Sequence, residues 1–179
     1  MTEIIKAPNS VLAQKTKPVK KVDKSVLKII GQMKQALLAA KDPVGVGLAA
    51  PQIGVPLQIF ITKPTSNSQI LVFINPKIEL LGKPIKKQKG REIKLEGCLS
   101  LPDIWGEVKR PSSLSITYLD EKGLKNTKKV RGFLTTIIQH EMDHLNGILF
   151  PKRVLEQKGA LYRSEKDENN EDVFEEIKI

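Results

Sequence analysis

The sequence predicts an α+β fold, in which short antiparallel strands form small sheets around a central helix and a second helix lies near the N-terminus. Many short runs rich in β-branched residues are separated by turn residues, whereas only two longer segments place apolar residues at helical spacing. The chain has 179 residues, of which 40% are hydrophobic and 28% charged, as in a globular protein. We therefore expect residues 1–179 to form one domain, with an acidic C-terminal tail from about residue 160.

The N-terminal part is expected to hold one helix after an irregular segment. Residues 1–22 contain prolines and no sustained period, so they are expected to be extended and irregular. A helix is predicted after them by apolar residues that recur every three or four positions, namely Val26, Ile29, Ile30, Met33, Leu37 and Ala40. Asp23 or Ser25 is the expected cap, and Asp42-Pro43 the expected end, because the residue before proline avoids helical backbone.

Strands are expected to dominate the middle of the chain. The segment GVGLAAPQIGVP at residues 45–56 has three glycines and two prolines, and is predicted to be a loop. Strands are predicted over Leu57–Thr62, Gln69–Ile74, Ile78–Leu81, Ile93–Leu101, Trp105–Lys109, Leu114–Leu119 and Leu124–Val130. We expect Asn75-Pro76 to break the chain between two of them, Lys83–Arg91 to be a basic connector, and Glu121–Gly123 to form a hairpin turn.

The C-terminal third is expected to contain the central helix and then a hairpin. Phe133–Asn146 begins with residues that favour strands, but Asn146-Gly147 is a good helix stop and the chemistry described below requires a helix. A short helical piece is expected near Lys152–Lys158. Ala160–Ser164 and Val173–Ile179 are then expected to pair as a hairpin.

Charge is distributed unevenly. Lys and Arg number 30 against 20 Asp and Glu, which gives a net charge of +10. Glu165–Lys178 carries seven acids and two bases, so the rest of the chain carries +15. Such a field attracts polyanions such as ribosomal RNA, although it also fits a surface rich in lysine that only keeps the protein soluble. The chain has few aromatic residues and no helix-turn-helix or zinc-finger pattern, so no sequence-specific nucleic-acid binding is expected.

Cysteine content and hydropathy bear on the compartment. A single cysteine, Cys98, cannot form an internal disulfide, which points to a reducing compartment. The sequence has no apolar run long enough to span a bilayer and no charged-then-apolar leader. We therefore expect a cytoplasmic protein with no membrane association.

The strongest motif is HEMDH at residues 140–144, which holds the only two histidines of the chain. On a helix, positions i and i+4 share one face, so both imidazoles can reach one metal ion. Glu141 does not need to bind the metal and is placed to accept a proton from a water molecule activated there. The alternative, two ordinary histidines beside surface carboxylates, requires this pattern to be accidental.

Two histidines leave the metal short of protein ligands. The longer metzincin pattern HExxHxxGxxH matches at Gly147 but has Phe150 in place of its third ligand. A zincin takes its third metal ligand from a downstream glutamate, and here that ligand would have to be Glu156 or an acid of the C-terminal tail. The remaining soft ligand is Cys98, although a lone cysteine is by default a small core residue.

Three segments in this order resemble the peptide deformylase family: GVGLAAPQ at 45–52, EGCLS at 96–100 and QHEMDHLNG at 139–147. The resemblance implies removal of the N-formyl group from formyl-methionine at the start of nascent polypeptides, with release of formate. It implies Cys98, His140 and His144 as metal ligands and Glu141 as the general base. It favours Fe²⁺ as the metal, and a site of this composition also suits Zn²⁺, Ni²⁺ or Co²⁺.

The resemblance also assigns residues around the metal. The donors for the oxyanion correspond to the Gln52 side-chain amide and the backbone N–H of Leu99. Gly45 and Gly47 are expected to let the backbone pass close to substrate. By position, the candidates for the pocket of the methionine side chain are Val46, Leu99, Ile137 and His140. Residues expected to orient the ligands are Glu96, Gln139 and Arg110, with Arg110 paired to Glu96.

The sequence departs from the family in two places. Many bacterial members have an arginine seven residues after the metal cysteine, where this chain has Trp105. The C-terminal basic helix that many members use to dock on the ribosome is replaced by the acidic tail, so ribosome association is possible only through the basic body. Two other functions remain: an HExxH metallopeptidase and a non-catalytic metal-binding or RNA-binding module.

Overall fold

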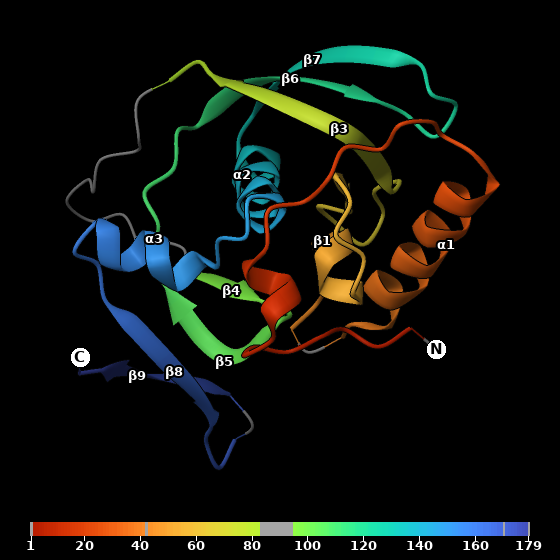
Figure 1. Cartoon of the computed structure of the whole chain (residues 1–179). Coiled ribbons are helices and arrows are strands. Elements are labelled where there is room, and N and C mark those ends of the chain that lie inside the picture. Colours follow the sequence, from red (N-terminus) through yellow and green to blue (C-terminus); the bar gives the residue numbers. More distant parts are fainter. Residues whose placement is uncertain (1, 42, 83–94, 170, 179) are drawn as a thin grey trace.

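The computed structural model describes residues 2–41, 43–82, 95–169 and 171–178 of the chain. Two antiparallel sheets and three α-helices within these residues confirm the α+β class (Figure 1). The five-stranded sheet, in spatial order, consists of β1 (Gly47–Ala49), β2 (Ile59–Thr62), β3 (Leu71–Leu80), β6 (Ser113–Leu119) and β7 (Lys125–Arg131). The four-stranded sheet consists of β4 (Glu96–Cys98), β5 (Leu101–Gly106), β8 (Leu161–Lys166) and β9 (Asp172–Ile177).

The helices begin where the sequence offers local caps. The Asp23 carboxylate accepts the backbone N–H groups of Ser25 (2.9 Å) and Val26 (3.0 Å) and starts α1 (Lys24–Ala39). This helix ends at Ala39, before Asp42, which lies outside the described residues. Helix α2 (Phe133–Leu145) confirms the predicted central helix. Helix α3 (Phe150–Glu156) begins two residues earlier than expected, since a proline in its first turn costs no hydrogen bond.

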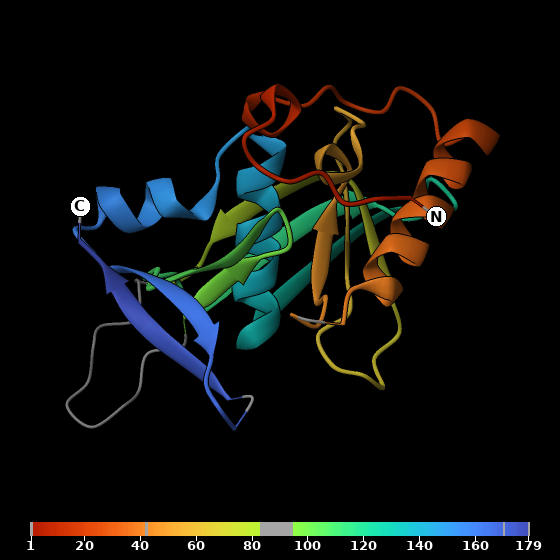
Figure 2. The ribbon, with the colours of Figure 1, turned by 90° about the horizontal axis from the view of Figure 1, so that it is seen from below.

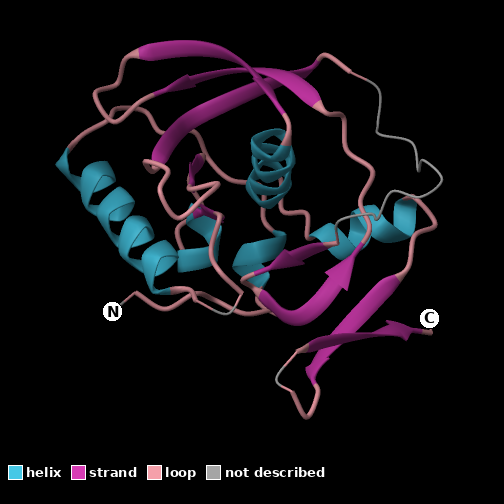
Figure 3. Ribbon diagram, turned by 180° about the vertical axis from the view of Figure 1, so that it is seen from behind, coloured by secondary structure: helices cyan, strands magenta, loops and turns pink. Residues whose placement is uncertain are grey.

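Helix α2 lies between the two sheets, as the views along and across it show (Figures 2 and 3). Strand β2 is buried on both faces: Ile59 and Ile61 pack in the cluster that contains α1, and Phe60 in the cluster with Ile138 of α2. This alternation follows from the two-residue period of a strand. A third, smaller cluster joins Cys98 to α3 and the second sheet. The contact of β4 with α2 is made by Cys98, whose Sγ lies 3.2 Å from His144 Nε2.

The glycine-rich segment 45–56, which we expected to be a loop, contains regular structure. It contains β1 and a 3₁₀ turn, η2 (Ala50–Ile53). Gly47–Ala49 is fully buried and pairs with Phe60–Thr62 of β2. Tertiary pairing thus makes a strand of three residues that are too few to show a period in the sequence.

The predicted break at Asn75-Pro76 is also wrong. Strand β3 runs through these residues from Leu71 to Leu80, and the pair instead shifts its register with β6 between Ile74 and Lys77. A proline lacks the N–H that the ladder needs, which explains an irregularity here. The Asn75 side chain both accepts from the N–H and donates to the carbonyl of Val19, each at 2.8 Å, and so ties the N-terminal segment to the sheet.

The strands around Cys98 have other bounds than predicted. Within the expected Ile93–Leu101, the described residues Glu96–Cys98 form β4. Leu101 instead begins β5, Leu101–Gly106, which starts and ends earlier than the expected Trp105–Lys109. Cys98 pairs with Leu101 in the returning strand, so the chain reverses at Leu99 and Ser100. Residues 93 and 94 and the connector Lys83–Arg91 lie outside the described residues.

The remaining elements follow the sequence closely. Residues 2–22 are irregular apart from a 3₁₀ turn at Ser10–Ala13 and an isolated bridge of Lys17 with Leu57, and Glu121–Gly123 lies in the turn between β6 and β7. The C-terminal tail forms the predicted hairpin, β8 with β9, which projects from the body (Figure 2). No described helix is long and apolar enough to cross a membrane.

Candidate metal centre and active site

The three predicted metal ligands meet where α2 passes β4. His140 and His144 share one face of the helix, with ring centroids 5.0 Å apart, and Cys98 ends the strand. The ligand atoms of the three residues lie within 4.8 Å of one another, and Cys98 Sγ is 3.2 Å from His144 Nε2. Two histidines and a cysteine in this arrangement suit a four-coordinate ion with one position left for water or substrate.

The electrostatics of these residues favour a thiolate. Burial opposes ionisation of the Cys98 thiol, but the His144 and His140 imidazoles stabilise the anion and hold the Cys98 pKa well below its usual value. Burial also disfavours the imidazolium of His140, yet its hydrogen bonds to Cys98 and Glu96 raise its pKa well above the ordinary one. The thiolate is the form of cysteine that binds metal, so the donor set fits a divalent cation.

A network of ion pairs supports His140 from behind. His140 Nδ1 lies 3.2 Å from Glu96 Oε2, and Arg110 holds Glu96 through two bonds of 2.6 and 2.8 Å. Arg110 also donates to Asp143 Oδ2 at 3.0 Å, and Arg153 donates to Asp143 Oδ1 at 2.7 Å. A carboxylate on the Nδ1 side fixes the ring orientation and leaves Nε2 as the nitrogen that could bind a metal ion.

This network confirms the predicted pairing of Arg110 with Glu96 and adds two residues that we did not single out. Asp143 lies inside the HEMDH motif, three residues after His140, and this place in the motif was the available signal in the sequence. The second residue is Arg153 of α3. The Gln139 side chain, which we expected to orient a ligand, donates its hydrogen bonds to backbone carbonyls instead. Its amide donates to the carbonyl of Pro111 at 2.9 Å and thereby holds α2 against the segment that follows Arg110.

Glu141 is buried beside the ligands. Burial raises the pKa of its carboxyl to about 7. Its Oε2 atom is buried and has no hydrogen-bond partner among the residues that the structure describes. An unpaired buried carboxylate oxygen is costly, so its position next to the ligands points to a partner that comes from solvent or substrate.

The Glu141 carboxylate occupies space that is open because Gly47 has no side chain. A Cβ at this position would collide with the Glu141 carboxylate and lie 2.8 Å from Cγ2 of Ile137. The close approach at Gly45 is different, since a Cβ there would lie 2.7 Å from Leu37 of α1. Both glycines are thus required by contacts within the protein, whatever their relation to substrate.

The tight contact at Gly47 predicts the effect of a single methyl group. We expect Gly47→Ala to displace the Glu141 carboxylate and to lower kcat by about 10²-fold, the usual cost of misplacing a reacting group by about 1 Å. Metal content should stay near that of the wild type, because Gly47 touches no ligand. Steady-state kinetics and elemental analysis measure both. Gly31→Ala is the matched control, since a Cβ there meets nothing within 4 Å; equal losses in both variants would contradict the assignment.

The Gln52 amide points at Cys98. Its Oε1 accepts the N–H of Ala49 at 2.8 Å, which fixes the side chain so that Nε2 faces the other way. Nε2 then donates to Ser100 Oγ at 3.1 Å and lies 3.7 Å from Cys98 Sγ. Gln52 is 2% exposed, so its position is set by packing as well as by these bonds. A fixed N–H donor beside the ligands is what an oxyanion requires.

The N-terminal arm, residues 5–7, fastens the same region. The Ile5 N–H donates to the Gln52 carbonyl and the Ala7 N–H to the Ser100 carbonyl, each at 2.8 Å. Between them the Lys6 ammonium donates to the Leu99 carbonyl at 2.6 Å. We had not assigned these residues, because nothing local in the sequence pairs them with positions 47 to 93 residues away.

The remaining predicted residues lie around this centre. Ile137 is buried and faces Gly47, one turn before Glu141 on α2. Val46 and Leu99 are partly buried, and Leu99 packs against the cluster of α1. Trp105 is partly buried on β5, next to Gly97 of β4.

The site combines a helix that bears two histidines and a buried glutamate with a cysteine from a neighbouring strand and an amide fixed beside them. These features place the chain among the metal-dependent hydrolases. The family model described as polypeptide deformylase matches residues 1–160, and the chain belongs to this family. Members are enzymes that remove the N-formyl group from nascent peptides, and this is the reaction of the chain. The metallopeptidase alternative is not favoured.

Named relatives and solved structures agree with this assignment. The chain is 39% identical to a peptide deformylase of Rhizobium meliloti over 150 residues, which cover 82% of this chain and 81% of the relative. It is 38% identical to one from Prochlorococcus marinus, over 97% of this chain and 79% of the relative. The crystal structure of a peptide deformylase from Synechococcus elongatus in complex with actinonin has a TM-score of 0.75 and 37% identity, over 85% of this chain and 78% of that one. The crystal structure of the peptide deformylase from Thermotoga maritima has a TM-score of 0.71 and 32% identity, over 86% of this chain and 97% of that one.

Proposed function

We propose that Cys98, His140 and His144 hold one divalent metal ion and that the formyl group is hydrolysed between this ion, Glu141 and Gln52. The observation that carries the proposal is the convergence of the three ligand atoms within 4.8 Å, next to a buried carboxylate with an unpaired oxygen. When bound, the ion supplies Lewis-acid chemistry to a water molecule and to the formyl carbonyl. We propose Fe²⁺ as this ion, with Zn²⁺, Ni²⁺ and Co²⁺ compatible with the same donors.

The residues of the chain then act on one water molecule and one amide. Glu141 accepts a proton from the water, whose oxygen forms a bond to the formyl carbon. The Gln52 Nε2 group and the Leu99 N–H donate to the carbonyl oxygen as it becomes negative, and each such donor contributes about 3 kcal/mol in comparable sites. Glu141 passes the proton to the departing amine as the C–N bond breaks, so the products are formate and a peptide with a free N-terminus.

The substrate is proposed to lie along the strands that flank this centre. Gly45, Val46 and Gly47 lead into β1, which is the terminal strand of its sheet. Leu99 follows β4, the terminal strand of the other sheet, and Ile137 lies between the two on α2. These residues offer apolar surface and backbone groups for the formyl-methionine.

One assay separates this activity from the other two functions that the sequence left open. Formate release is measured from a formyl-Met tripeptide, and cleavage is measured on the same peptide without the formyl group. A deformylase gives formate and leaves the second peptide intact. Cleavage of the unformylated peptide would identify a peptidase, and no reaction by metal-loaded protein would identify a binding module.

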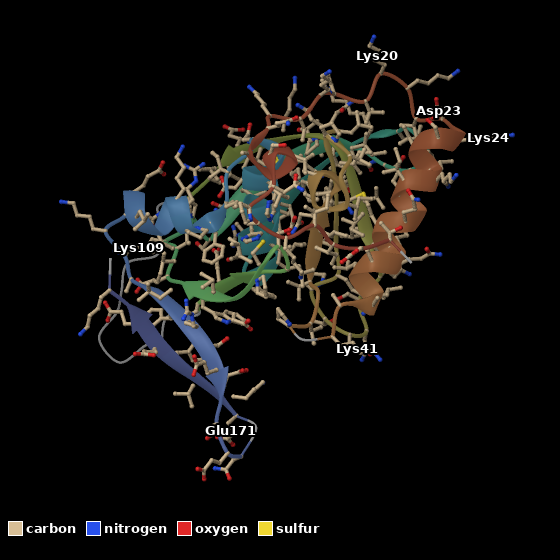
Figure 4. All side chains as sticks on the ribbon, turned by 60° about the horizontal axis from the view of Figure 1, so that its bottom comes forward. Lys20, Asp23, Lys24, Lys41, Lys109 and Glu171 are labelled. Atoms are coloured by element: carbon tan, nitrogen blue, oxygen red, sulfur yellow. The ribbon has the colours of Figure 1, made fainter. Side chains whose placement is uncertain are left out.

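We propose that the enzyme acts in the cytoplasm and associates with the ribosome through its basic body. Exposed lysines such as Lys20, Lys24, Lys41 and Lys109 lie around the body, whereas the hairpin that carries Glu171 at its tip projects away from it (Figure 4). The hairpin cannot serve as a basic helix, since its two strands pair throughout and their net charge is negative.

Neutralising the hairpin tip tests the role of charge. We expect Glu168→Gln with Glu171→Gln to strengthen co-sedimentation with ribosomes at low salt, and binding of both proteins to weaken steeply as salt increases, because each neutralised phosphate releases counterions. Asn169→Gln, at the same turn, is the neutral control. Association that does not depend on salt would show that the charge only aids solubility. Truncation after Ser164 is a poorer test, because it removes β9 and the packing of Ile177, and should lower the melting temperature.

A further inference from the structure

Strands β6 and β7 present one face to the interior and the other to solvent. Leu114, Ile116 and Tyr118 of β6 are buried in the cluster shared with α2, so the residues between them point to the opposite side of the sheet. The hydroxyls of Thr117 and Thr127 meet on that side at 2.9 Å. We call this surface the outer face; on β6 and β7 it comprises Ser113, Ser115, Thr117, Lys125, Thr127, Lys129 and Arg131. Every one of these side chains can donate a hydrogen bond.

The outer face is positively charged. Lys125, Lys129 and Arg131 are exposed along β7, the terminal strand of its sheet. Strand β3, on the other side of β6, adds one exposed cation, Lys77, and one acid, Glu79, both opposite outer-face residues of β6. In the part of the chain that the structure describes, none of these four cations forms an ion pair with a carboxylate. Their charge is therefore available to a partner outside the chain.

The basic outer face and the acidic hairpin lie at opposite ends of the molecule. Figure 1 shows β6 and β7 at the top and the hairpin of β8 and β9 at the bottom, and the view from behind in Figure 3 shows the same arrangement. The segment Glu165–Lys178, which contains most of the hairpin, carries seven acids and two bases. A molecule with charges separated in this way is oriented by the field of a polyanion, so that the outer face approaches it first.

A partner on the outer face would leave the active site open. Helix α2 packs on the inner side of the five-stranded sheet, where Ile138 and Leu145 join the cluster of β6. On this helix His144 lies 3.2 Å from Cys98 of the second sheet. The five-stranded sheet therefore separates the outer face from the predicted metal ligands, and a nascent chain can reach the site while the outer face is occupied.

We propose that the outer face binds the phosphate backbone of duplex RNA and is the surface through which the enzyme associates with the ribosome. The inference rests on the proposed ribosome association and gives it a location. Lysine, arginine, serine and threonine are the side chains that commonly donate to phosphate oxygens. Single-stranded RNA needs aromatic side chains on which its bases stack, and the described outer-face residues include none. Duplex RNA is bound through its phosphates and 2′-hydroxyl groups, which suits a face made of donors.

Removing the outer-face charge of β7 tests the proposal. Fluorescence anisotropy measures binding of a labelled RNA duplex longer than the roughly 16 base pairs that a double-stranded RNA-binding domain spans. The test variant combines Lys125→Gln, Lys129→Gln and Arg131→Gln. Between about 50 and 200 mM salt, the affinity of the wild type should fall roughly 15- to 40-fold more than that of the variant, because each lost phosphate contact removes about one unit from the slope of log affinity against log salt.

The matched control removes the same charge from exposed positions outside the strands of the outer face. It combines Lys15→Gln, Lys41→Gln and Lys152→Gln. This variant should keep most of the salt dependence of the wild type. A third variant exchanges the cations of β7, as Lys125→Arg, Lys129→Arg and Arg131→Lys, and should bind RNA as the wild type does. All three variants should release formate from a formyl-Met tripeptide at the wild-type rate, since none of these residues touches the site.

Co-sedimentation of the same variants with ribosomes connects the face to the ribosome. The test variant should sediment less with ribosomes than the wild type and the control do. Its melting temperature should stay near that of the wild type, because the changed side chains are exposed. Equal losses in the test variant and the control would overturn the inference, since the attraction would then come from the whole basic body.

Two further results would also overturn it, and they can be told apart. Tighter binding to phosphatidylserine vesicles than to RNA, lost in the test variant, would identify the outer face as a lipid-binding surface. Failure of the wild type to sediment with ribosomes at low salt would overturn the proposed ribosome association and this inference with it. Absence of formate from the metal-loaded wild type would overturn the deformylase function and not the inference.

Discussion

Cys98→Ala should abolish the bound metal and nearly all deformylase activity. The thiolate is one of the three proposed protein ligands, and the two histidines that remain share one helix face and cannot close a site alone. The loss in metal affinity should exceed the roughly 10- to 100-fold that follows from changing an outer partner of a ligand. Elemental analysis of the purified variant, alongside formate release, measures both effects.

The control for this variant is a measurement that shows whether the protein is still folded. Cys98 is buried in a small cluster with Phe150, Val154 and Leu161, and losing one sulfur atom there should cost at most about 1 to 2 kcal/mol of unfolding free energy. Far-UV circular dichroism and thermal melting should therefore show a folded protein. A folded variant that keeps a full equivalent of metal would show that Cys98 is a core residue and that the third ligand lies elsewhere.

The histidines and their glutamate could be predicted because their geometry is local. A spacing of four residues on a helix places two imidazoles on one face without reference to the rest of the fold. Cys98 is 42 residues from His140 in sequence, and only the requirement for a third ligand and the family resemblance connected the two. The structure brings its sulfur to 3.2 Å from His144 because β4 crosses α2.

The groups that hold the ligands could not be predicted in full, because their pairing is long-range. Arg110 was expected to meet Glu96, but its third bond to Asp143 and the bond from Arg153 depend on α3 packing near the end of α2. The contact of Lys6 with the Leu99 carbonyl likewise depends on the course of an irregular segment. Such segments carry no period from which a contact can be inferred.

The errors in the predicted strands also arise from long-range pairing. Gly47–Ala49 is a strand only because β2 lies beside it. Asn75-Pro76 stays within β3 because residues before the pair are held by β2 and residues after it by β6. Local propensity predicts a loop and a break at these places, and tertiary pairing overrides both. Trp105 is similar: the sequence indicated a bulky residue near the site, and only the register of four strands shows that it joins Gly97 to the hairpin.

Glu141→Gln should separate metal binding from chemistry. Glutamine keeps the size of the side chain but cannot accept the proton of the attacking water, so kcat should fall by at least the roughly 10²- to 10⁴-fold typical of losing a general base. The metal should remain, because Glu141 is not among the three proposed ligands. KM should change little, since the variant retains the contacts that position the peptide.

The environment of Glu141 supports its role as the proton acceptor that this variant removes. The side chain is 3% exposed, and burial raises its pKa to about 7, which is the range in which a carboxyl both accepts and returns a proton near neutral pH. Glu141→Ala is the companion variant: it removes the buried carboxyl and leaves a cavity beside Gly47, so similar losses in both variants would attribute the effect to the missing base and not to altered packing. Turnover close to that of the wild type in a metal-loaded Glu141→Gln protein would show that another group moves the proton.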